Sequence, residues 1–307
     1  MREPRRLGST PVHPGPTFAN DHPALERAWH PVALAADVTD DATEVDLLGR
    51  RWVLRREAPG ATVRADPDPD GRVSEHLGVV WLAPAPVAKP LTELIACPQF
   101  DDPAFAWAWL APARTTAAAS LLADNFLDIA HFPFVHAGTF GSAEDAEVPA
   151  YDVEVASDVE FSYSYTHGYR NEEDPGVAAG LRPLRQTRRV ACRYRLPFQM
   201  VLTLEHVESG GTTVVLFFLQ PEHRRSTVAY TCVMRDHMGG APVDLAAAVA
   251  FEHAVLMEDL ALQEQIDLAG LPLERATEVH VRADRAGLEL RRALHRFAGT
   301  RAAAMSA

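Results

Sequence analysis

The stretch DNFLDIAHFPFVH, residues 124–136, carries the residue types from which proteins build metal sites. Two carboxylates, an Asn and two His stand among aromatic and aliphatic side chains within thirteen positions. If residues 124–131 form a helix, Asn125, Asp128 and His131 follow one another at three-residue steps and share a face. Asp128 can then accept a hydrogen bond from one ring nitrogen of His131 and direct the other nitrogen towards a metal.

His136 adds a second imidazole to this arrangement. Pro133 is expected to end the helix, so that His131 and His136 can point into one cavity although they are five residues apart. Two neutral imidazoles and one carboxylate from elsewhere form the facial triad of non-haem Fe(II) enzymes, which leaves coordination positions open. A pair of His at this spacing is weak evidence in a chain with 13 His. The full pattern D-N-x-x-D-x-x-H-x-x-x-x-H is more specific, because five positions coincide.

A later apolar segment, AFEHAVLMEDLALQEQ, offers the third ligand. Its acidic candidates are Glu252, Glu258 and Asp259. Helical phase places Glu252, Asp259 and Gln263 on one side and Glu258 away from them. The residues alone leave the choice between Asp259 and Glu252 open.

The composition is that of an ordinary globular protein, with 307 residues, 47% hydrophobic and 23% charged. No apolar run approaches the roughly 20 residues of a membrane helix, and the start of the chain lacks the apolar core of a signal peptide. Three scattered cysteines indicate a reducing compartment, so we expect a cytoplasmic protein without a membrane partner. The net charge of −13 argues against a nucleic-acid partner.

The chain outside the motif predicts an α+β fold. Residues 1–24 are expected to be a flexible arm. Next come a short helix and extended chain, a hairpin in EVDLLGRRWVLRR and a strand in VSEHLGVVWLAPA. Thr115 or Thr116 is the expected N-cap of the motif helix. Alternating segments between residues 151 and 237 predict an antiparallel sheet with one covered face and helices packed on it. Two more helices are expected, a mostly buried one over PVDLAAAVAFEHAVLMEDLALQEQIDL and a last one over roughly VRADRAGLELRRALHRFAG.

The motif resembles the mononuclear iron site of Rieske non-haem iron oxygenases, which hydroxylate aromatic rings or remove O-methyl groups. HFPFVH looks most like the vanillate-demethylase-like branch. The segments LERAWHPVALAADVTD, CPQFDDPAF and LPLERATEVHVRADRAGLELRRAL resemble other parts of that family, so the similarity covers most of the chain from about Leu25.

The resemblance implies a C-terminal helix-grip-like antiparallel sheet around a long helix, forming a mononuclear iron catalytic domain over residues 97–307. Residues 25–96 would be a reduced, β-rich remnant of a Rieske domain. Fe(II) would be bound by His131, His136 and Asp259. Asp128 would orient His131 and bridge to an electron donor, and Asn125 would lie just outside the ligands. The family's head-to-tail assembly implies a homotrimer.

The sequence departs from the family at its second centre. That centre is a [2Fe–2S] cluster held by C-x-H and C-x-x-H, and no His stands two or three positions after Cys97, Cys192 or Cys232. Only EAPGATVRADPDPDGR separates RRWVLRR from VSEHLGVVWL, where the cluster loops would lie. We therefore expect an iron site without a [2Fe–2S] cluster in this chain.

Three hypotheses account for the missing donor. In the first, a separate Rieske protein or a ferredoxin or reductase supplies electrons to an oxygenase, as in the divided N-demethylases of this family. In the second, no external donor is needed, because an electron-rich substrate supplies the electrons or because the metal serves a cyclase, isomerase or hydrolase. In the third, the chain is a non-catalytic partner subunit, which an intact triad argues against.

The mostly apolar neighbourhood of the motif favours an apolar or aromatic small molecule as substrate. The expected pocket wall consists of Phe126, Phe134, Phe161, His206, Leu256 and Leu260. A basic cluster in LRPLRQTRR comprises Arg182, Arg185, Arg188 and Arg189. We interpret the cluster as a solvated hairpin rim; the alternatives are a docking patch for an acidic partner and an anchor for a substrate carboxylate.

Overall fold

An eight-stranded antiparallel sheet forms the centre of the computed structural model, which describes residues 16–56, 58, 63–66, 72–84, 90–274 and 278–304. The strand order is β10-β11-β12-β13-β14-β15-β8, and β9 also pairs with β15. The strands are β8 (Ala106–Trp109), β9 (Ala113–Thr115), β10 (Val153–Ser157), β11 (Glu160–Arg170), β12 (Arg185–Arg195), β13 (Gln199–His206), β14 (Thr212–His223) and β15 (Ser226–Arg235).

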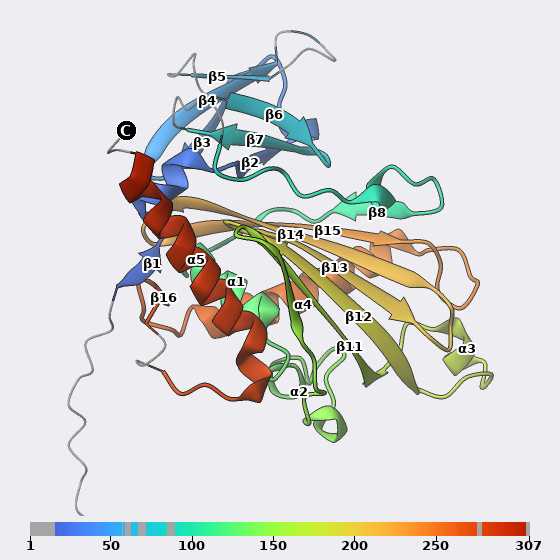
Figure 1. The fold of residues 1–307 in the computed structure, drawn as a ribbon. Helices are drawn as coiled ribbons and strands as arrows, with labels where there is room; N and C mark the ends of the chain where they lie inside the picture. The colour runs from blue at the N-terminus through green and yellow to red at the C-terminus, as the bar shows by residue number, and fades with distance from the viewer. Residues whose placement is uncertain are drawn as a thin grey trace, which may run out of the picture.

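Two small N-terminal sheets lie above the central sheet in Figure 1. One has the order β2-β7-β6 and the other β3-β4-β5. Their strands are β2 (His30–Leu34), β3 (Thr43–Leu47), β4 (Arg50–Arg56), β5 (Val63–Asp66), β6 (Arg72–His76) and β7 (Val79–Ala83). The hairpin expected in EVDLLGRRWVLRR is β3–β4. VSEHLGVVWLAPA forms two strands and not the one expected, because Leu77 and Gly78 turn with φ of 51° and 73°.

The opposite face of the central sheet packs against α1 (Ala119–Leu127), α4 (Leu245–Gln263) and α5 (Arg285–Ala304). The short helices α2 (Phe132–Val135) and α3 (Pro175–Ala178) lie in connections. The predicted α+β class, with helices on one face of an antiparallel sheet, is confirmed. The boundary between domains at residue 97 stays a prediction.

The expectation of a single covered face is wrong for the inner strands. All ten residues of β15 are buried. Tyr230 and Cys232 face the N-terminal sheets, whereas Ala229 and Val233 pack on the helix side. The strand is therefore apolar throughout, because both faces of the sheet are covered there.

Two further expectations about order and burial need correction. Residues 1–15 lie outside the described residues, but Thr17–Ala19 forms β1, which pairs with β16 (Gly270–Pro272), and Phe18 is fully buried. This part of the expected arm belongs to the core. The helix α4 buries one side only, and Met257 on its other side is 45% exposed. None of the helices among the described residues is both long and apolar enough to cross a membrane.

The motif helix is shorter at both ends than expected. α1 begins at Ala119, and its cap comes from Asn20, whose side-chain oxygen accepts from the Ala119 N–H at 2.9 Å. Thr115 instead belongs to β9. The helix ends at Leu127, because Asp128 turns into an extended conformation and its carboxylate accepts from the N–H groups of Ala130 and His131.

Candidate metal centre

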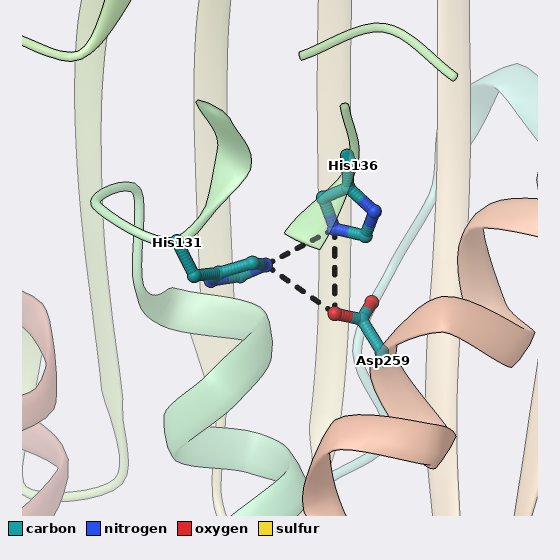
Figure 2. Close-up of side chains that lie close together, drawn as sticks. All are labelled: His131, His136 and Asp259. Carbon is teal, nitrogen blue, oxygen red and sulfur yellow. Dashed lines mark hydrogen bonds and ion pairs between the residues drawn. The ribbon is translucent and has the colours of Figure 1, made fainter. Parts of the chain in front are cut away.

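Three predicted ligands meet between the motif and α4 (Figure 2). The Nε2 atoms of His131 and His136 are 3.1 Å apart, and each lies 3.3 Å from Asp259 Oδ1. His131 stands in the turn between α1 and α2, His136 directly follows α2, and Asp259 projects from α4. All three side chains are at most 10% exposed. Donors that bind one metal ion at about 2.1 Å and at right angles lie about 3 Å apart, so the triangle has the right size.

The outer ring nitrogens explain why this cluster needs a cation. His131 Nδ1 lies 3.2 Å from Asp128 Oδ2, and His136 Nδ1 lies 2.8 Å from Glu258 Oε2. An ionised carboxylate only accepts hydrogen bonds, so each Nδ1 carries the proton and each neutral Nε2 presents a lone pair. Two lone pairs and the Asp259 carboxylate then face one point. A metal ion satisfies all three, and the residues fit a mononuclear site of the two-His, one-carboxylate type.

The pKa values describe the cluster without a metal. Burial lowers the pKa of His131, but its hydrogen bonds with Asp128 and Asp259 outweigh burial and raise the pKa to about 9. Burial raises the pKa of Asp259, but hydrogen bonds from His131 and His136 lower it to about 2. A proton on His131 thus supplies the positive charge that the cluster requires, and a metal ion would displace it.

Asn125 ties the motif to α4. Its Nδ2 donates to Asp259 Oδ1 at 2.7 Å, and its Oδ1 accepts from Gln263 Nε2 at 2.9 Å. Asn125 is 7% exposed, so this chain of hydrogen bonds is shielded from water. It fixes the orientation of the Asp259 carboxylate.

The structure separates the three acidic candidates on α4. Asp259 joins the two His, whereas Glu252 lines the neighbouring cavity. Glu258, which helical phase had directed away from the site, accepts from His136 and from Thr139 Oγ1. The sequence signal for this role is that a ligand His requires an acceptor for its outer nitrogen, and Glu258 is the acidic neighbour of Asp259.

The residues expected in the pocket wall lie in different parts of the structure. Phe126 lines a cavity of about 70 Å³ beside the triad. Phe134 is 74% exposed, and Phe161 is buried in the core against Tyr194 at 5.2 Å between ring centroids. Leu256 and Leu260 also pack into the core, and His206 lines an adjacent polar cavity of about 250 Å³. Sequence reasoning missed these wall residues: Phe140, Phe217, Phe251, Val215 and Glu252.

With this geometry established, comparison with known proteins identifies the family. Residues 115–299 match the family described as the vanillate O-demethylase oxygenase C-terminal domain. The chain belongs to this family. The resemblance to Rieske-type oxygenases is confirmed, and the protein is an oxygenase-like oxidoreductase.

The chain is also similar to individual demethylases and monooxygenases. The chain is 26% identical over 272 residues to the probable methylxanthine N7-demethylase NdmC of Pseudomonas sp. (strain TJI-51), covering 87% of this chain and 92% of the relative. The solved structure of Pseudomonas putida CBB5 NdmA with caffeine matches with a TM-score of 0.71 at 19% identity, over 89% of this chain and 90% of NdmA. Dicamba monooxygenase bound to 3,6-dichlorosalicylic acid matches with a TM-score of 0.70 at 15% identity, over 94% of this chain and 100% of that chain. The two structures establish a shared fold.

Proposed function

We propose that the chain is a mononuclear non-haem Fe(II) oxygenase that hydroxylates, demethylates or oxidatively cyclises an apolar or aromatic small molecule. Electrons would come from a separate donor protein. One observation carries the proposal. The Nδ1 atoms of His131 and His136 are each hydrogen-bonded to a carboxylate, and three lone-pair donors converge beside an apolar cavity. The names of the relatives, a demethylase and a monooxygenase, support oxidation as the reaction class.

Fe(II) would be held by His131 Nε2, His136 Nε2 and Asp259 Oδ1. Bound there, it would supply the activation of O2 at its open positions. Asp128 and Glu258 keep the protons on the two Nδ1 atoms, so that neither imidazole rotates away. The apolar wall of the cavity excludes water from the substrate beside the metal.

We place the docking site for the electron donor at a surface cleft next to Asp128. The cleft has a volume of about 450 Å³ and includes Asp128 and His131 in its wall. The Asp128 side chain is 34% exposed, and His131 also lines the inner cavity. The pair therefore connects the protein surface with the substrate side of the site. The homotrimer and the absence of a [2Fe–2S] cluster remain predictions within this proposal.

The first experiment measures iron and acid-labile sulfide in anaerobically purified protein, together with the EPR spectrum after nitric oxide is added. We expect about one iron per chain, no sulfide and the signal of a ferrous nitrosyl. His131→Ala and Asp259→Ala should lose the iron, whereas His253→Ala, an exposed His on α4, should retain it. Tightly bound zinc without a nitrosyl signal, or iron retained in both triad variants, would contradict the proposal.

A second experiment tests the separate donor. Substrate-dependent O2 consumption should require an added cluster-bearing reductase, and Asp128→Asn should lose most of that activity even when excess Fe(II) keeps the site loaded. Turnover without any added donor, unchanged in Asp128→Asn, would favour a donor-free metal enzyme.

A further inference from the structure

The basic cluster in LRPLRQTRR does not behave as one surface feature. In β12, buried residues alternate with more exposed ones, and Arg188 lies on the inward side with only 7% exposure. The other three arginines each have a carboxylate partner: Arg182 with Asp174, Arg185 with Asp145, and Arg189 with Glu205. The interpretation as a solvated rim is therefore wrong for Arg188, which lies on the helix-covered face of the sheet.

The guanidinium of Arg188 is held between aromatic rings. Its central carbon lies 4.6 Å from the ring centroid of Tyr169 and 5.1 Å from that of Phe140. Its Nε donates to His167 Nε2 at 3.3 Å. Burial lowers the pKa of His167 to about 3, helped by the charge of Arg188, so this partner is neutral. The contacts orient the guanidinium but do not balance its charge.

A second arginine in the same cavity shows what a balanced site looks like. Arg235 is 5% exposed, and its two Nη atoms bind both oxygens of Glu173 at 2.9 and 3.0 Å. None of the carboxylates in the described part of the chain forms such an ion pair with Arg188. Glu252 lines the same two cavities as Arg188 and interacts with its charge through space, but no hydrogen bond joins the two side chains. A buried guanidinium without a hydrogen-bonded carboxylate is costly, so we expect a ligand to supply that carboxylate.

The position of Arg188 connects this charge to the metal centre. Arg188 lines both the apolar cavity beside the triad and the adjacent polar cavity. The Phe140 ring stacks on His136, with 4.9 Å between ring centroids, and also contacts Arg188. One aromatic side chain thus separates the guanidinium from a ligand of the triad.

We propose that Arg188 is the anchor for a carboxylate on the substrate, whose ring lies along Phe140 with its far end at His131, His136 and Asp259. With Nε bound to His167, the two Nη atoms remain for a bidentate contact with a planar carboxylate. The substrate class is therefore a small aromatic acid. The position of the reacting end rests on the proposed function of the triad, whereas the anchor itself does not.

The test compares two probes of equal shape, 4-methoxybenzoate and neutral 4-methoxybenzamide, by isothermal titration calorimetry on the iron-loaded protein without O2. We expect the carboxylate to bind at least about tenfold more tightly, as a charge-assisted bidentate contact predicts. Arg188→Met should abolish this preference, because the carboxylate loses a charge-assisted contact and the amide loses at most a neutral hydrogen bond. Arg189→Met, on the exposed side of the same strand, should preserve the preference.

Arg188→Lys covers the case in which the Met variant does not fold. Lysine keeps the positive charge but lacks the paired N–H donors of a guanidinium, so the preference for the carboxylate over the amide should fall without disappearing. Equal affinity for both probes in the wild type, no carboxylate binding in the millimolar range, or a preference that survives in Arg188→Met would overturn the proposal. Repeating the titration on metal-free protein separates the anchor from the iron site, because failure of the oxygenase proposal leaves this ratio unchanged.

Discussion

Glu258 offers the sharpest test of how the metal centre is built. Its carboxylate accepts from His136 Nδ1 at 2.8 Å and is itself held by the Thr139 hydroxyl at 3.0 Å. The side chain is 28% exposed and does not line the cavity beside the triad. Removing it therefore alters the orientation and basicity of one ligand without removing that ligand.

The expected size of the effect follows from this contact. Loss of an outer partner of a ligand His typically weakens metal binding about 10–100-fold, or about 1.4–2.7 kcal/mol. Glu258→Ala should lie at the upper end of this range, because the contact is short and the partner is fixed. Glu258→Gln keeps an acceptor oxygen but loses the charge, so its loss should be about tenfold.

The assay is anaerobic competition for Fe(II) between the protein and a coloured chelator, with the unfolding free energy of the metal-free protein as a second measurement. His253→Ala serves as the control, because His253 is exposed on the same helix. Unfolding should change by less than about 1 kcal/mol in the Glu258 variants, as for other partly exposed sites. An iron affinity within twofold of the wild type in Glu258→Ala would refute the reasoning.

Three further predictions concern stability. Asn125→Ala removes the donor to Asp259 and should cost about 1–3 kcal/mol in urea unfolding; an unchanged midpoint would show that the hydrogen bond contributes nothing. Burial lowers the pKa of His30 to about 4, against the effect of its hydrogen bond to a backbone carbonyl. Because this folded-state pKa lies below the unfolded value of 6.5, only the unfolded state takes up a proton on His30 between these two values. The stability is therefore complete at neutral pH and is lost progressively as the pH falls from about 6.5 to about 4. Between pH 7.5 and 5 this loss amounts to about 2 kcal/mol of unfolding free energy. His30→Gln should reduce the pH dependence of the unfolding free energy by that amount, and parallel pH profiles for the variant and the wild type would disprove the assignment. Asn20→Ala removes the cap from Ala119 and also the hydrogen bonds that Asn20 Nδ2 donates to three oxygens of β14 and β15. It should cost at least about 1–2 kcal/mol in thermal or chemical unfolding; a stability equal to that of the wild type would contradict a structural role for Asn20.

The part of the site that sequence could predict is local. Asp128 and His131 are three residues apart, and their contact forms although the expected helix stops at Leu127. Asp128 starts a turn, and its carboxylate accepts hydrogen bonds from two backbone N–H groups of that turn. This turn brings the side chains of Asp128 and His131 together as a helix would have done. A short spacing therefore predicted the pair correctly while predicting its backbone conformation wrongly.

The residues that sequence could not place depend on contacts between distant segments. Helical phase grouped Glu252 with Asp259, but seven residues separate them by about 10 Å along the helix axis. Which of the two meets His131 depends on where α4 crosses the motif. The same limit applies to Glu258 and Arg188, because which side of a helix or strand is covered depends on elements elsewhere in the chain.

The same geometry explains how one helix serves two purposes. α4 carries Asp259 at the triad and, two turns earlier, Glu252 at the junction of the apolar and polar cavities. The facing wall comes from inward side chains of the central sheet, among them Arg188 and Phe217. The triad thus comes from the motif and α4, whereas the cavity wall that faces α4 comes from alternate residues of the strands. Substitutions on the inward side of β12 or β14 can therefore change which molecule is bound while the three metal-binding side chains stay in place.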